Sequence, residues 1–346
     1  MERKRKTPLL KTIVTIGISV AVAVFFLWLA FRGLDFQTIQ GYFAEANYLW
    51  VLFAAVFGLL AYWIRAIRWN LLLEPMGYNI SNSNALWTIS FGYLMNLTVP
   101  RSGELARSTA LYGVEKVPVD QSFGTIILER VIDLLCMMLF LCLALILKYD
   151  AIQSFFQYAF SPQDSESTTS GFWLWVIGLL LVSGAILFFT LRSKLQKIAF
   201  FNKLYGIVDG LVQGMTSIFR LKRPGLFLLY SLGIWICYYL AAYIVCFALP
   251  ETAGFTPADG LFIIVIGTLG MIVPASGGIG AFHLAVKLGI GALFVSAGGS
   301  FEKGSEIGLA YAFISHTLQL VIMAVMGFIS IPFLAKARSQ SPTIAK

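Results

Sequence analysis

The chain has 346 residues, of which 58% are hydrophobic and only 12% are charged. A soluble domain normally carries about 25% charged residues, so this composition excludes an ordinary soluble protein and indicates a polytopic membrane protein. A formal charge of +8 could point to nucleic acid, but in a membrane protein it follows from basic residues gathered in cytoplasmic segments. We therefore expect no nucleic acid partner.

Six stretches are long and apolar enough to cross a hydrocarbon core of about 30 Å as helices. The first follows the basic stretch MERKRK, but its apolar part is too long for a signal peptide and no small-residue cleavage site follows it. We interpret it as a retained transmembrane helix. In chain order the predicted spans cover about residues 11–32, 47–68, 119–147, 171–191, 225–249 and 306–335.

Two further apolar stretches, about residues 84–114 and 257–298, are interrupted by VPRSG and by VPASGGIG. Proline cannot donate a backbone hydrogen bond and glycine adopts conformations closed to other residues, so each helix should end and restart there. We expect each stretch to enter and leave on one side as a re-entrant hairpin, with both termini cytoplasmic. Most basic residues then fall in cytoplasmic segments, as the positive-inside rule requires.

The two breaks share the pattern Val-Pro-x-Ser-Gly, and each precedes a long helix with polar residues inside it. The halves, about residues 11–147 and 171–335, are therefore predicted to be inverted copies within a single domain, 1–346. A stretch at about 197–220 is predicted to be an amphipathic connector on the cytoplasmic leaflet. The expected fold is an all-α polytopic membrane protein with about six spanning helices and two re-entrant broken-helix hairpins in inverted repeats. Because glycine and proline are common in membrane helices, a chance likeness of the breaks stays open.

The first break, NLTVPRSGELAR, places charges inside an apolar chain. Ser102 is a good N-cap for a second half-helix, whose N–H groups and positive dipole would form an anion site with Arg101. Charges in the span 119–147 would cost about 2.5–3.5 kcal/mol each at the bilayer centre, so we expect them to face the hairpin and balance it. A purely structural ion network is the alternative. The predicted substrate-binding residues are Arg101, Ser102, Glu104, Arg107, Glu129, Arg130 and Asp133.

The second break is poorer in charge, and its small residues would let a lipid tail or another helix approach closely. The two histidines of the chain are more often packed than functional in such a setting. Arg65 and Arg68 lie at a helix end beside tryptophans and are expected to snorkel to cytoplasmic headgroups. The secondary candidates for substrate binding are Ser276, Gly277, Gly278, His283, Lys287 and His316.

Signatures of known catalytic and metal sites are missing from the sequence. There is no phosphate-binding GxxxxGK[ST] loop, no HExxH motif and no cysteine–histidine set with zinc spacing. The four cysteines lie in apolar runs, as inert small hydrophobic residues do. We expect no catalytic residue, metal or cofactor.

The stretches NLTVPRSGELARSTALYG, SFGTIILERVIDLL and GMIVPASGGIGAFHLAV resemble the membrane region of lysylphosphatidylglycerol synthases, over about residues 10–335. That family includes flippase regions that move aminoacylated phospholipid between leaflets, and stand-alone proteins of unknown substrate. The resemblance implies that the charged residues predicted above occupy the family's motif positions, whereas His283 stands near a position that is more usually acidic. In the full-length proteins the aminoacyl transferase is a separate soluble domain, and we expect none after the last helix.

The expected function is therefore a flippase-like transporter, not an enzyme, that moves a phospholipid or lipid-linked headgroup across a bacterial inner membrane. Three alternatives stay open: a membrane component of a lipid aminoacyl or glycosyl transferase system, a secondary transporter of a small charged solute, and a scaffold. The expected partner is membrane phospholipid. Homo-oligomerisation and a separate lipid-modifying enzyme are further open partners.

Overall fold

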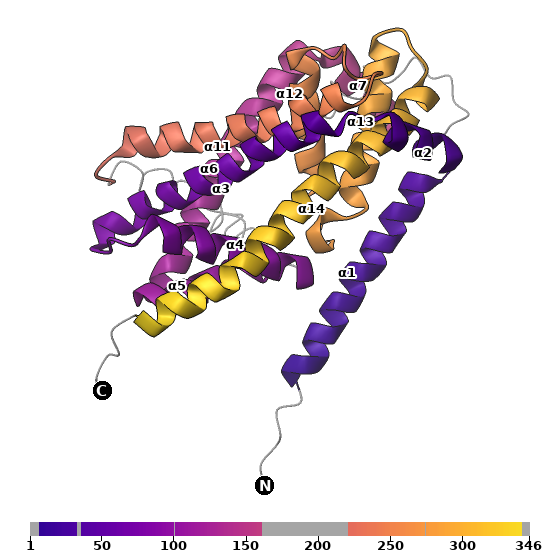
Figure 1. Ribbon diagram of the computed structural model, residues 1–346. Coiled ribbons are helices and arrows are strands. Elements are labelled where there is room, and N and C mark those ends of the chain that lie inside the picture. The colour runs from indigo at the N-terminus through magenta and orange to yellow at the C-terminus, as the bar shows by residue number, and fades with distance from the viewer. Residues whose placement is uncertain (1–6, 33–35, 100, 161–220, 274, 341–346) are drawn as a thin grey trace, which may run out of the picture.

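The computed structural model describes residues 7–32, 36–99, 101–160, 221–273 and 275–340. All regular elements in these ranges are helices (Figure 1). In chain order they are α1 (Thr7–Phe31), α2 (Phe36–Glu45), α3 (Tyr48–Leu73), η1 (Glu74–Met76), α4 (Asn82–Thr98), α5 (Gly103–Glu115), α6 (Val119–Leu147), α7 (Tyr149–Phe160), α11 (Pro224–Val245), η3 (Cys246–Ala248), α12 (Pro257–Gly270), η4 (Ser276–Gly278), α13 (Ala281–Ser296) and α14 (Phe301–Gln340).

The helices confirm a polytopic membrane protein. In the described part of the chain, five helical stretches are long and apolar enough to cross a membrane, and four of them match predicted spans. The fifth lies in the predicted second hairpin, where its regular helix, α13, has 16 residues and reaches only about 24 Å. The predicted span 171–191 and the connector 197–220 lie outside the described residues. The five stretches are Tyr48–Met76, Val119–Leu147, Pro224–Ala248, Ser276–Ser296 and Phe301–Gln340.

Both interrupted stretches fold back on themselves. The carbonyl oxygen of Gly92 in α4 lies so close to Gly103 at the start of α5 that a Cβ there would overlap it. In the second stretch, a Cβ on Gly267 of α12 would lie 2.8 Å from the Phe282 ring of α13. Farther from the break, Gly289 of α13 faces Ile266 of α12 in the same way. The limbs of each hairpin therefore run antiparallel in close contact, as predicted.

The tips of the two hairpins meet inside the molecule. A Cβ on Gly277 in the second tip would lie 3.3 Å from the side chain of Leu97, which is near the end of α4, and 3.2 Å from Leu320 of α14. The hydroxyl groups of Ser276 and Ser19 lie 3.0 Å apart, which joins the same tip to α1. The tip of the second hairpin is thus packed against α1, α4 and α14, and contact with protein is a condition under which irregular backbone is tolerated at membrane depth.

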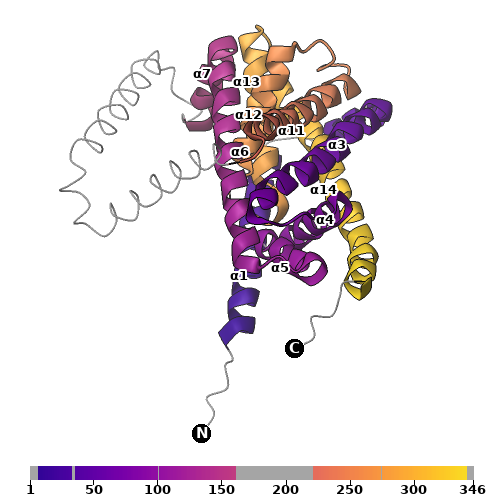
Figure 2. The ribbon, with the colours of Figure 1, turned by 90° about the vertical axis from the view of Figure 1, so that its left-hand side faces the viewer.

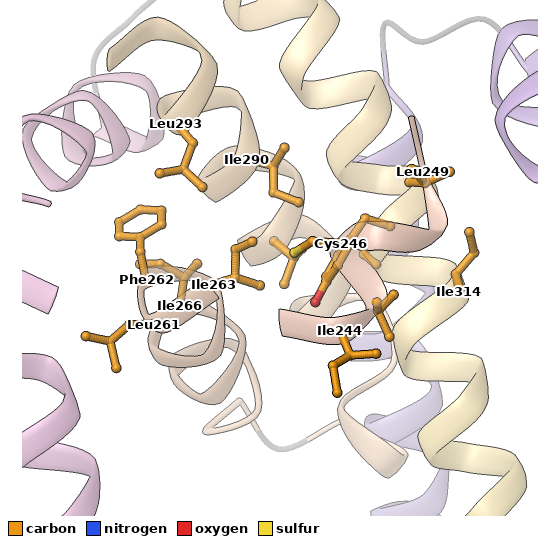
Figure 3. Packing of buried hydrophobic residues seen from close by; sticks show 14 of the residues in the cluster. Ile244, Cys246, Leu249, Leu261, Phe262, Ile263, Ile266, Ile290, Leu293 and Ile314 are labelled. Carbon is orange, nitrogen blue, oxygen red and sulfur yellow. The ribbon is translucent and has the colours of Figure 1, made fainter. Parts of the chain in front are cut away.

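Two of the three hydrophobic clusters in the described residues hold most of these elements. The larger one joins α12, α13, the end of α11 and α14, and Figure 3 shows Ile263 and Ile266 beside Ile290 and Leu293. The smaller one gathers residues of α3, α4, α5, α6 and α11 around the fully buried Trp69. The start of α1 and the end of α14 lie at the same end of the molecule as α5 (Figures 1 and 2).

Candidate functional site

The first break lies between the end of α4 at Thr98 and the start of α5 at Gly103. The last turn of α4 closes with the Val99 N–H donating to the carbonyl oxygen of Met95 at 2.9 Å. Arg101 follows with φ at 60°, in the left-handed region that non-glycine residues rarely adopt. Its side chain is exposed, and no ion pair found in the described residues includes it. The structure therefore leaves Arg101 outside the network formed by the other predicted charges.

Ser102 holds the N-cap position of α5, but the predicted cap hydrogen bond is absent. Its hydroxyl donates instead to the carbonyl oxygens of Val99 at 2.7 Å and Met95 at 3.0 Å, because the folded-back chain brings the end of α4 within reach. The Gly103 N–H donates to the Oδ1 atom of Asn96 at 2.7 Å. Asn96, which the sequence did not single out, thus caps α5 from the preceding helix.

Four buried charged side chains and the partly buried Asp133 meet behind this break, and we call Arg65, Arg68, Arg107, Glu129 and Asp133 the arginine cluster. Glu129 binds Arg107 at 2.7 Å and Arg68 at 3.4 Å. Asp133 binds Arg68 at 2.8 Å and Arg65 at 3.2 Å. Glu129 and Asp133 lie four residues apart on α6, so they project from one face toward α3 and α5. The cluster ties these three helices together.

The prediction that Arg65 and Arg68 snorkel to headgroups is wrong. They are only 3% and 0% exposed, because α3 crosses α6 at the level of Asp133. Helix α11 completes their surroundings: Arg65 donates to the Tyr238 hydroxyl at 3.0 Å and Arg68 to the Ser231 hydroxyl at 3.1 Å. A spacing of three residues places both arginines on one face of α3, and that is the sequence signal that could have revealed them.

Aromatic rings fix two of the buried guanidinium groups. The Arg107 Cζ atom lies 3.5 Å from the centroid of the Trp69 ring, a cation–π contact, and the Trp69 Nε1–H donates to the Thr125 hydroxyl at 2.8 Å. The Arg68 Cζ atom lies 5.6 Å from the Phe227 ring centroid. The orientation of these guanidinium groups is therefore set by packing as well as by charge.

The charges do not balance as predicted. The arginine cluster holds three guanidinium groups but two carboxylates, and the neighbouring pair of Arg130 and Glu104 leaves that excess of one positive charge unchanged. Several buried N–H groups also have no hydrogen-bond partner among the described residues: Nε of Arg65, Nε of Arg68, and Nε and Nη2 of Arg107. Excess positive charge with spare donors suits an anionic ligand.

A small pocket, open to the outside of the protein, lies beside the arginine cluster. Arg107 forms its buried side, while Arg130 and Glu104 form an ion pair of 3.1 Å at its rim. The structure thus brings Glu104, Arg107 and Arg130 to one pocket, with Glu129 directly behind Arg107. The lining residues are Ile89, Gly92, Tyr93, Asn96, Gly103, Glu104, Arg107 and Arg130.

The sequence model of the lysylphosphatidylglycerol synthase TM region family matches residues 16–327. The chain belongs to this family. It is also similar to the UPF0104 membrane protein MJ1595 of Methanocaldococcus jannaschii, with 28% identity over 108 residues, which cover 30% of this chain and 32% of that protein. A comparison with solved structures finds no match.

In this member of the lysylphosphatidylglycerol synthase TM region family, the candidates near the second break lie apart from the pocket, because none of them lines it. The rings of His283 and His316 stack with centroids 5.0 Å apart. Nε2 of His316 lies 2.9 Å from the Gly277 carbonyl oxygen, and Nδ1 of His283 accepts from the Gly280 N–H at 3.2 Å. Both histidines hold the turn of the second hairpin.

Lys287, like the two histidines, makes hydrogen bonds that hold the second hairpin in place. Its Nζ atom donates to the carbonyl oxygens of Ala30 at 2.9 Å and Arg32 at 3.4 Å. A cation at the C-terminal end of a helix satisfies carbonyl groups that lack partners within the helix, so Lys287 fastens the end of α1. Where the chain is described, no group of three or more histidine, cysteine, aspartate or glutamate residues could hold a metal ion.

Proposed function

We propose that this protein is a flippase-like transporter whose pocket between α4, α5 and α6 receives the phosphate of a phospholipid or lipid-linked headgroup. The observation that carries the proposal is the uncompensated positive charge of the arginine cluster beside an open pocket in a membrane protein. The family is lipid-related by its description, which supports a lipid as the ligand.

Arg107 is the group best placed to bind the phosphate. It lines the pocket, its side chain is only 6% exposed, and two of its three guanidinium nitrogen atoms have no hydrogen-bond partner among the described residues. A guanidinium group offers two parallel N–H donors to one phosphate, and in a poorly hydrated site these bonds are strong. Glu129 holds the group from the side away from the pocket, so binding would need little rearrangement.

The arrangement of the hairpins supports transport across the membrane. Two broken hairpins whose tips meet inside the molecule are typical of transporters built from inverted repeats, in which the ligand binds near the midplane. We propose this relation for the two halves of the chain. We also propose a bacterial inner membrane location with both termini cytoplasmic, since the basic residues of the sequence gather in the segments assigned to that side.

Reconstitution in liposomes with leaflet-resolved measurement of several phospholipids tests the proposal. We expect the wild type to move at least one lipid, and Arg107→Gln to move it at least about tenfold more slowly because a charge-assisted hydrogen bond is lost. Arg107→Lys keeps the positive charge but loses the two parallel N–H donors of the guanidinium group, so an intermediate rate is expected. Arg223→Gln, in an exposed ion pair with Glu74, is the matched control and should keep the wild-type rate.

The outcomes separate the alternatives. Equal rates for wild type and Arg107→Gln, with both proteins folded, would count against the pocket. Flux of a small anion without lipid movement would favour a secondary transporter of a charged solute. Turnover of radiolabelled lipid by the purified protein would favour a lipid transferase component instead.

A further inference from the structure

Arg130 lies between exposed apolar side chains on the outer face of α6. Ile127 precedes it by three residues and Leu134 follows it by four, so the three side chains share one face of the helix. Ile127 and Leu134 are 53% and 40% exposed, and the Arg130 side chain is 47% exposed. The position is about 16 Å from the start of α6. A half-exposed guanidinium group on a lipid-facing apolar surface is expensive, so it calls for a functional explanation.

Glu104 of α5 meets Arg130 across the rim of the pocket. One Arg130 Nη2–Glu104 Oε1 contact of 3.1 Å joins the two helices at this point, and the Glu104 side chain is 27% exposed. Leu105, the residue beside it on α5, is 60% exposed. The ion pair therefore closes the pocket at a place where apolar side chains of both helices face outward.

The ion pair behind it is different. Arg107 and Glu129 are only 6% and 1% exposed in their side chains, and each has a second contact that fixes it: Trp69 for Arg107 and Arg68 for Glu129. Between exposed side chains an ion pair is weak and its geometry is easily given up. The rim pair can therefore exchange partners, whereas the inner pair stays in place.

We propose that the Glu104–Arg130 ion pair is a lateral gate, through which a lipid headgroup enters the pocket from the bilayer between α5 and α6. The incoming phosphate replaces Glu104 as the partner of Arg130 and then reaches Arg107, while the acyl chains stay outside against Leu105, Ile127 and Leu134. Asp133, at 3.8 Å from Arg130, keeps the guanidinium group at the rim after Glu104 has left. This inference rests on the lipid function proposed above.

Locking the gate tests the inference. The four cysteines are first replaced by alanine or serine, and Glu104→Cys with Arg130→Cys is then bridged by a bifunctional thiol reagent that a reductant can cleave. We expect bridging to reduce lipid movement at least tenfold relative to the unbridged double variant, and reduction to restore it. The matched control, Glu74→Cys with Arg223→Cys, replaces an ion pair of 2.8 Å away from the pocket, and bridging it should leave the rate unchanged.

A second variant covers the case in which the double cysteine protein is inactive before bridging. Glu104→Gln keeps Arg130 but removes its charged rim partner, so the gate should open more readily and lipid should move faster than in the wild type. Equal or slower movement in Glu104→Gln, or undiminished movement in the bridged protein, would overturn the gate and leave the proposed function standing. If the wild type moves no lipid at all, the proposed function fails and the gate fails with it.

Discussion

The two hairpins break at the same Val-Pro-x-Ser-Gly pattern, yet they are held in place by different interactions. The first is tied to α6 by charge, through Arg107 with Glu129 and Glu104 with Arg130. The second has one ion pair at its far end, between Lys148 and Asp259, and its turn is held by backbone proximity and by hydrogen bonds such as that between Ser276 and Ser19. The break pattern thus locates the turn, while the residues that follow it determine its chemistry.

The difference is clearest at the start of the second helix of each hairpin, which is α5 in the first and α13 in the second. At Gly280, before α13, φ is +85° and a Cβ would lie 2.5 Å from the Ala23 carbonyl oxygen and 2.8 Å from the Leu27 nitrogen of α1. Close contact between backbones leaves no room for a ligand there. At the corresponding end of α5, the pocket opens instead. We therefore propose that the first hairpin binds the ligand and that the second anchors α1.

The largest expected effect tests the dependence of the first hairpin on charge. Glu129→Leu leaves the guanidinium groups of Arg68 and Arg107 buried without this carboxylate, so we expect a loss of about 3–5 kcal/mol in unfolding free energy. Thermal unfolding of the purified protein in detergent measures it. Glu104→Gln, at the half-exposed rim, should change stability by less than about 1 kcal/mol. Similar losses in both variants would show that burial does not distinguish the two pairs.

The next effect tests the dependence of the second hairpin on close approach. Gly280→Ala adds a Cβ against the backbone of α1 and requires a left-handed conformation, so we expect a loss of about 3 kcal/mol. Gly298→Ala is the control, because Gly298 has φ of +81° but open space around its Cβ position. It should lose only about 1–2 kcal/mol, from backbone strain alone. Equal thermal shifts would mean that contact with α1 contributes nothing.

Local chemistry explains what the sequence could predict. Proline and glycine mark both breaks, and long apolar runs mark the helices, because these signals act within a few residues. The spacing of Glu129 and Asp133 correctly placed both on one face of α6, but only Glu129 binds the hairpin, through Arg107, whereas Asp133 binds Arg65 and Arg68 of α3. The prediction that the charged residues gather was thus largely right, although Arg101 stays outside the ion network.

Contacts between distant segments explain the errors. Whether Arg65 and Arg68 reach headgroups or the Asp133 carboxylate depends on where α3 crosses α6, whereas their spacing in the sequence shows only that they share one face of α3. The prediction that Ser102 caps α5 was wrong for the same reason, because Asn96 reaches Gly103 only after the chain has folded back. The predicted charge balance was wrong as a consequence, because Arg65 and Arg68 were not counted among the charges of the site.

A smaller effect is expected where the second hairpin holds α1. Lys287→Met removes the donor to the carbonyl oxygens of Ala30 and Arg32 while keeping a similar side-chain length. We expect a loss of about 1.5–3 kcal/mol, the range for hydrogen bonds to charged groups, and faster thiol labelling of a Ser19→Cys reporter on α1. Lys336→Met, on the exposed end of α14, is the control and should change neither quantity. Unchanged labelling in Lys287→Met would show that α1 is held by other contacts.

The smallest effect separates stability from ligand binding at the first break. Asn96→Ala leaves the Gly103 N–H without its acceptor, and the loss of a cap of this kind costs about 1 kcal/mol. Asn96→Asp keeps an acceptor oxygen in the same place, so the unfolding midpoint should return toward that of the wild type. Asn96 also lines the pocket, however, and a carboxylate there would repel a phosphate. We therefore expect Asn96→Asp to be the more stable variant but the slower one in lipid movement, whereas a residue that only caps α5 would give stability and transport that rise together.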